Sequence, residues 1–323
     1  MKPAKRSNVK TSVGGQAVLE GIMMRGPAKW CLAVRTPDGK VVAETHDTVM
    51  RPWAKWPFIR GVFNFVDSLV MGYKTLMRSA ELAMGEEYEE EEPGKFDAWV
   101  EKKFGDAGTK VVMALASVLG IVLALGLFMF LPTGAVSLVD NFVPLGAAKP
   151  VLEGVVKILI FVLYLVLVRR MKDIHRVFSY HGAEHKTIYC YEAGDELTVE
   201  NIRTHSRFHP RCGTSFIFIV LIISIFLNSA LPWPAGAGGA LLRMVLKLAM
   251  LPVVMAVSYE VLRLAGRYDN WFTRILSAPG MWIQRLTTNE PEDDMIEVAI
   301  AAVSPVLPPA AEAEEAPLPG PVG

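Results

Sequence analysis

Two long stretches of the sequence contain no charged residue. Val111–Leu131 covers 21 residues and Thr214–Trp233 covers 20. As α-helix, about 20 apolar residues cross the ~30 Å hydrocarbon core of a bilayer. A hydrophobic content of 52% and a mean hydropathy of +0.32 place the whole chain outside the range of ordinary soluble proteins. The sequence therefore predicts a mainly α-helical membrane protein.

Two further apolar stretches, 151–168 and 241–262, predict additional spans although each contains charges. The expected fold thus has about four transmembrane helices, at 111–131, 151–168, 214–233 and 241–262.

The charges inside the two weaker spans need an explanation, because ionised groups are costly in hydrocarbon. Glu153 and Lys157 are four residues apart, which places them on one helical face in the favourable order for an ion pair. Arg243 and Lys247 lie near the start of their span, so we expect their side chains to extend outward to the headgroups.

Basic residues are distributed unevenly among the connections between the predicted spans. The segment 169–213 contains eight: Arg169, Arg170, Lys172, Arg176, Lys186, Arg203, Arg207 and Arg211. The connection 132–150 contains only Lys149, and 234–240 contains none. The positive-inside rule therefore predicts that both termini and the segment 169–213 face the cytoplasm.

The rest of the chain divides by composition and periodicity. A Pro37-Asp38-Gly39 turn between apolar runs predicts a β-hairpin, and apolar residues at helical spacing predict an amphipathic helix, either in the membrane plane or packed on other helices. The expected segments are a basic N-terminal tail (1–11), a cytoplasmic β-containing subdomain (12–56), the amphipathic helix (57–84), an acidic linker and pre-membrane helix (85–110), a juxtamembrane helix (263–288) and a disordered tail (289–323).

Five of the six histidines lie between residues 175 and 209, in the polar loop predicted between the second and third spans. Its core, His181-Gly182-Ala183-Glu184-His185, fits the H-x-x-E-H pattern of inverted zinc hydrolases. On a helix the two histidines share a face and can both bind a metal, while Glu184 could accept a proton from water as a general base.

A third metal ligand would come from elsewhere, with Glu192, His209 and Cys212 as candidates. An alternative is a closed structural zinc site made by His181, His185, His209 and Cys212, which would catalyse nothing. In that case Glu184 would orient a histidine. His205, four residues before His209, is a further candidate ligand.

Arg203, Arg207 and Arg211 recur every four residues and would form a basic stripe on a helix near the bilayer. Anionic lipid headgroups are the simplest partner for such a stripe, and a substrate carboxylate or phosphate is the alternative. The formal net charge is zero and basic runs are short, so we expect no nucleic-acid partner.

Several separated motifs carry a family resemblance. They are Gly14–Gly21 with Met23–Pro27, Tyr180–Lys186, Cys190–Glu192 and His209–Phe216. Together they resemble the YqhQ-like family of bacterial multi-spanning membrane proteins, a domain of unknown function described as predicted metal-dependent enzymes. The resemblance covers roughly Ser12–Gln284 and implies a bacterial cytoplasmic membrane location. It places His181, Glu184, His185, Glu192, His209 and Cys212 in signature motifs, together with Gln16, Glu20 and Arg25, and leaves His205 outside them.

The glycine-rich N-terminal motif is expected to fold against the histidine-rich loop. Glu20 is then a candidate metal ligand or supporting group, and pairing with Arg25 is the alternative. The sequence as a whole favours a cytoplasm-facing zinc protein, and the leading hypothesis for its activity is hydrolysis of a membrane-associated peptide or lipid. The alternative is a non-enzymatic accessory or scaffold subunit of a membrane assembly with a structural metal site.

Overall fold

The structure is a computed structural model that describes residues 13–48, 56–85, 111–112, 115–210, 212–233, 238–267 and 271–307. The predicted basic tail (1–11), most of the acidic linker (85–110) and Arg211 lie outside these residues. The chain divides into two compact units, which are described separately: unit 1 contains 1–84, 165–223 and 252–323, and unit 2 contains 85–164 and 224–251.

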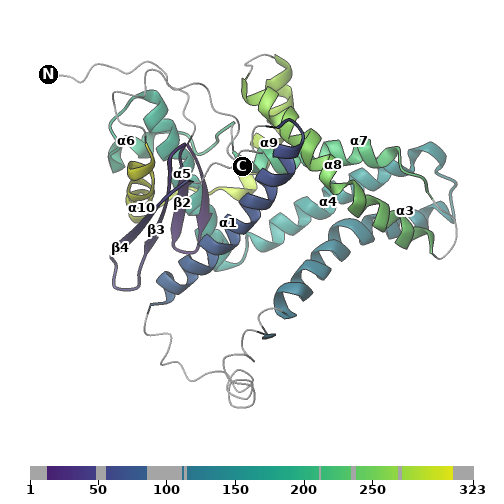
Figure 1. The fold of residues 1–323 in the computed structure, drawn as a ribbon, viewed down its shortest axis with the longest axis horizontal. Coiled ribbons are helices and arrows are strands. Elements are labelled where there is room, and N and C mark those ends of the chain that lie inside the picture. The colour runs from purple at the N-terminus through teal and green to yellow at the C-terminus, as the bar shows by residue number, and fades with distance from the viewer. Residues whose placement is uncertain are drawn as a thin grey trace. The chain divides into compact units, whose positions relative to one another are not determined.

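Unit 1 contains a four-stranded antiparallel sheet in the order β1-β2-β3-β4 (Figure 1). The strands are β1 (Gly14–Val18), β2 (Gly21–Arg25), β3 (Lys29–Arg35) and β4 (Val41–Asp47). The predicted hairpin is present as β3 and β4, and the chain turns between them at Gly39, whose φ of 81° favours glycine. The prediction was incomplete, because the glycine-rich motif adds two further strands.

Both faces of this sheet are buried. Side chains alternate along each strand, so every strand contributes to both faces. Ile22 and Met24 of β2 point into one core and Met23 points into the other. Helix α1 (Ile59–Met84) supplies Met71 and Leu82 to the second core. The sheet is therefore a middle layer between helices.

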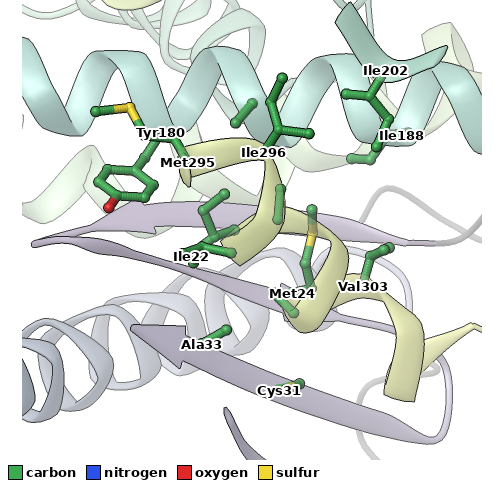
Figure 2. Packing of buried hydrophobic residues seen from close by; sticks show 14 of the residues in the cluster. Ile22, Met24, Cys31, Ala33, Tyr180, Ile188, Ile202, Met295, Ile296 and Val303 are labelled. Atoms are coloured by element: carbon green, nitrogen blue, oxygen red, sulfur yellow. The ribbon is translucent and has the colours of Figure 1, made fainter. Parts of the chain in front are cut away.

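The first core is closed by two helices, α5 (Lys172–Ala193) and α10 (Asp293–Val303), as Figure 2 shows. Tyr180 of α5 and Ile296 of α10 are both fully buried there. The prediction that 289–323 is a disordered tail is therefore wrong for α10 and for the 3-10 turn Ser304–Val306 that follows it. Residues 308–323 lie outside the described part.

Helix α1 confirms the predicted amphipathic helix, but its packing is inverted relative to a soluble helix. Its small residues Gly61, Gly72, Thr75 and Ser79 are buried. Its large apolar residues are exposed, and they include Ile59, Phe63, Val66, Leu69, Val70, Tyr73 and Leu76. This arrangement supports the in-plane membrane position, which stays a prediction.

Three helices are long and apolar enough to cross a membrane: Leu115–Asp140, Gly146–Val168 and Leu241–Leu264. The first contains a π-helical turn at Gly126–Phe130 (η3) and continues as α3 (Leu131–Asp140), so it extends beyond the predicted end at residue 131. The second consists of the short turn η4 (Gly146–Ala148) and α4 (Lys149–Val168), and the third lies within α8 (Gly239–Arg267).

The predicted span 214–233 appears as α7 (Gly213–Ser229), which is apolar but has only 17 residues. The juxtamembrane helix predicted at 263–288 corresponds to α9 (Trp271–Thr287).

The structure of unit 2 contradicts both predictions for the charged residues in the spans, the Glu153–Lys157 pair and the outward extension of Arg243 and Lys247. Arg243 and Lys247 do not extend outward, because they are only 1% and 2% exposed. Both bind Glu153, which therefore takes its partners from α8 and not from Lys157 on its own helix. A partner 90 residues away in the sequence replaces the local pair that the four-residue spacing predicted.

We expect Ile296→Ala to lower the free energy of unfolding of the sheet-containing unit by about 2–5 kcal/mol, because it leaves a cavity in the first core. Ile275→Ala, at a position that is 62% exposed, is the matched control and should change it little. Thermal unfolding of the detergent-purified chain measures both. Equal effects would contradict the placement of α10 in the core.

Candidate metal centre

The histidine-rich segment is mostly helical and not the polar loop that the sequence predicted. It consists of α5 and the short helix α6 (Val199–Thr204). Helix α5 ends at Gly194, whose φ of 77° gives the left-handed conformation common after a helix. The helical form places His181, Glu184 and His185 within one turn of α5, as the four-residue histidine spacing required.

Gly182 allows α5 to approach another segment of the backbone closely. A Cβ atom added at this position would lie 2.0 Å from the carbonyl oxygen of Asn289. The Asn289 amide N–H also donates to Phe178 O at 2.9 Å, and its side-chain Nδ2 donates to His175 O at 3.1 Å. Glycine at 182 therefore keeps α5 against the segment that follows α9.

The two histidines of the motif are oriented by backbone carbonyls. His181 Nδ1 lies 2.9 Å from Thr287 O, and His185 Nδ1 lies 2.6 Å from Arg207 O. A carbonyl can only accept, so each Nδ1 carries the proton and donates it. In the neutral form of each ring, Nε2 then carries the lone pair, which is the form in which a histidine binds a metal.

These two Nε2 atoms and the sulfur of Cys212 form one cluster. His181 Nε2 lies 3.2 Å from Cys212 Sγ, and all three potential ligand atoms lie within 4.8 Å of one another. Bond lengths of ~2.0–2.3 Å place the donors around a tetrahedral zinc roughly 3.3–3.8 Å apart. The His185 Nε2 atom is buried and has no hydrogen-bond partner in the described part of the chain. The residues therefore fit a zinc ion.

The charges of this cluster favour a thiolate. Burial raises the pKa of the Cys212 thiol, but the neighbouring His181 and His185 outweigh burial and hold this pKa well below its usual value. Burial likewise disfavours the charged imidazole of His181, but attraction and hydrogen bonding to Cys212 raise its pKa to about 9. A thiolate is the form of cysteine that binds metals.

Glu184 lies beside the cluster and is buried. Burial raises the pKa of its carboxyl group, and the two histidines act in the opposite direction. The backbone N–H of Gly15 donates to the carboxylate, while Oε2 is buried without a hydrogen-bond partner in the described residues. This contact confirms that the glycine-rich motif folds against the histidine-rich segment.

His209 and Glu192 lie together beside the cluster. The His209 ring centroid is 5.8 Å from that of His185, but His209 is not one of the three residues whose ligand atoms cluster. His209 Nε2 is 3.5 Å from Glu192 Oε2, and the His209 ring packs edge-on against Tyr189. Gln284 of α9 brackets the His209 backbone, accepting from its N–H at 2.8 Å and donating to its C=O at 2.7 Å. Among the three candidates for the third ligand, the geometry selects Cys212.

Glu20 and His205 have partners away from the cluster. Glu20 binds Arg176 and accepts from the Tyr180 hydroxyl at 3.1 Å, so the expected pair with Arg25 is absent from the described contacts of Glu20. His205 Nε2 lies 3.1 Å from Asp195.

The expected helical arginine stripe does not form, because α6 ends at Thr204, between Arg203 and Arg207. Arg203 pairs with Asp293, and Arg207 lies 3.3 Å from Glu290. A contact of these arginines with headgroups stays a prediction.

Sequence reasoning missed the groups that hold the candidate ligands in place. Thr287 and Arg207 act through backbone carbonyls, which carry no side-chain signal, and Gly15 acts through its amide. Helix α10 did leave a signal. Met295, Val298, Ala299 and Ala302 recur at helical spacing after two acidic residues, the pattern of an amphipathic helix start.

The fold and the site define a class: helical proteins with apolar helices able to span a membrane, a small antiparallel sheet and a partly buried cluster of two histidines and a cysteine. Residues 56–308 match the family described as "Protein of unknown function (DUF1385)", and the chain belongs to this family. It is also 33% identical over 307 residues, 94% of each chain, to "Uncharacterized protein YqhQ" of Bacillus subtilis (strain 168). No solved structure matches the chain.

We expect Gly182→Ala to destabilise the protein by about 1–3 kcal/mol, because the added methyl group collides with the Asn289 carbonyl and forces α5 outward. Gly134→Ala is the matched control within a helix, since a Cβ there meets nothing within 4 Å. Thermal unfolding compares the two variants. A Gly182→Ala protein as stable as Gly134→Ala would contradict the close approach.

Proposed function

We propose that this chain is an integral membrane metalloprotein that binds one divalent metal ion, zinc, through His181, His185 and Cys212. The observation that supports this most directly is the pair of Nδ1–H bonds to Thr287 O and Arg207 O. They turn the Nε2 atoms of both histidines toward the Cys212 sulfur, as carbonyls that accept from the other ring nitrogen do in zinc proteins.

We further propose that the site is hydrolytic. Three protein ligands leave a fourth position open, which is the arrangement of catalytic zinc sites. A bound zinc ion supplies Lewis-acid activation of water. Glu184 would accept the proton of the attacking water as general base and pass it to the leaving group. Its buried, raised-pKa carboxyl group suits that role. Water would add across an ester or amide bond, giving an acid and an alcohol or amine.

The membrane location narrows the substrate class. Three helices of the chain are long and apolar enough to span a bilayer, and α5 follows the end of one of them with only a short turn between. A site so close in sequence to a span favours a membrane-associated peptide or a lipid ester as substrate. The excess of basic residues in 169–213 supports a cytoplasmic orientation in the bacterial inner membrane.

A non-enzymatic accessory or scaffold role is the second candidate, and one observation favours it. Two ligands come from α5 and the third directly precedes α7, and His185 is only 1% exposed. A metal held there would tie the start of α7 to the sheet-containing core without performing chemistry.

Metal content tests the binding proposal. We expect the detergent-purified chain to hold stoichiometric zinc, and His181→Ala and Cys212→Ser to lose it, as measured by elemental analysis. His205→Ala is the matched control and should retain zinc, because His205 pairs with Asp195. His209→Ala should also retain it, whereas a closed four-ligand site would lose it. A wild-type chain that neither holds nor takes up metal would remove the proposal's basis.

Glu184→Gln separates catalysis from structure. We expect this variant to keep its zinc and its thermal stability but to lose hydrolysis by about 100-fold or more, because the general base is gone. Wild-type and variant proteoliposomes are incubated with a total membrane extract, and mass spectrometry follows peptide and lipid products that have gained water. Equal product profiles for the two proteins would favour the scaffold role.

A further inference from the structure

Unit 2 contains a buried cluster of charged side chains with an excess of positive charge. Glu153, Lys157, Arg243 and Lys247 are 4%, 8%, 1% and 2% exposed. All lie in helices long and apolar enough to span a membrane. The cluster therefore places three cations and one carboxylate in a region where unpaired charge is strongly disfavoured.

Glu153 is shared by two of these cations. One carboxylate oxygen binds Lys247 and accepts from the Thr133 hydroxyl at 2.8 Å, and Lys247 also donates to Thr133 Oγ1 at 2.7 Å. The other oxygen lies 3.2 Å from Arg243 Nη2. Both carboxylate oxygens of Glu153 are thus engaged, and the carboxylate neutralises one of the three positive charges.

Arg243 is further solvated by neutral groups. It donates to the carbonyls of Asn228, Leu231 and Pro232 at the end of α7 and stacks 3.9 Å from the Trp233 ring. The carbonyls at a helix C-terminus carry about half a negative charge. These neutral groups offset part of the positive charge of Arg243. Neither they nor Glu153 provide a counter-charge for Lys157.

Lys157 makes no ion pair in the described part of the chain. It lines a cavity of about 10 Å³ together with Glu153, Asn228, Ser224 and Arg243. The Glu153 carboxylate at this cavity pairs with Arg243 and Lys247 and not with Lys157. Arg243 Nε, a donor, is buried there without a hydrogen-bond partner. Such a volume is about that of one water molecule. A monatomic anion is only slightly larger than water, whereas a sulfate or a phosphate ester is too large.

We propose that this cavity binds a small monovalent anion of halide size, chloride being the physiological choice. The Lys157 ammonium group and the Arg243 Nε–H donate hydrogen bonds to the anion. The anion adds a second negative charge to that of Glu153, whose single carboxylate already pairs with Arg243 and Lys247. This site is independent of the proposed metal centre, because none of its residues belongs to unit 1.

The test compares thermal unfolding of the detergent-purified full chain in sodium chloride and in sodium gluconate at equal ionic strength. We expect Tm in chloride to be higher by about 2–4 °C, because a ligand that binds only the folded state stabilises it. Bromide should act like chloride. Equal Tm values in the chloride and gluconate salts would overturn the proposal and would indicate a neutral Lys157 amine.

Lys157→Met assigns the effect to this cavity. We expect the variant to lose the chloride dependence and to be more stable than wild type in gluconate, since the uncompensated charge is gone. Lys74→Met removes an exposed lysine from α1 and should leave the chloride dependence unchanged. Chloride dependence that persists in Lys157→Met would overturn the assignment.

A crystal of the wild-type chain grown in bromide provides a measurement that does not depend on the variant folding. An anomalous peak beside Lys157 and Arg243 supports the site, and its absence at high bromide concentration contradicts it. Metal analysis of the same protein reports separately on the metal centre, so failure of one proposal does not affect the other.

Discussion

The close approach of α5 to the backbone at Asn289 positions most of the candidate site. Because residue 182 has no side chain, the helix meets the carbonyl directly, and the neighbouring polar groups of Asn289 bind the α5 backbone. The same approach brings the end of α9 within reach of His181, whose Nδ1 binds Thr287 O. A helix pair separated by ordinary side chains would leave that imidazole free to rotate.

The candidate metal centre is thus held by backbone groups more than by side chains. Two carbonyls orient the histidines, and an amide of β1 binds Glu184, the proposed general base. Since backbone groups are fixed by the packing of whole elements, the ligand geometry depends on the sheet, α9 and α10 together. The Gln284 side chain also holds the backbone of His209, because it accepts from the His209 N–H and donates to the His209 carbonyl.

Sequence reasoning succeeded where the information is local and failed where it is not. The H-x-x-E-H spacing correctly placed His181 and His185 on one helical face, and the charge-free run 111–131 located a helix able to span a membrane. The partners of Arg243 and Lys247 could not be predicted, because Glu153 lies 90 or more residues away and its local spacing to Lys157 suggested a different pair. Helix α10 was missed because Pro, Ala and Glu after residue 305 dominated the composition of its segment, although its own apolar periodicity was present.

The exposed apolar face of helix α1 affects how the sheet-containing unit would behave without the spanning helices. Its small residues face the sheet, Gln16 and Tyr259, while its aromatic and branched side chains face outward. An apolar patch of this size on the sheet-containing unit is typical of a membrane or protein contact. Cutting away the spanning helices would therefore not yield a water-soluble domain. The sheet-containing unit carries its own exposed apolar surface and is expected to partition into detergent micelles even when it is expressed alone.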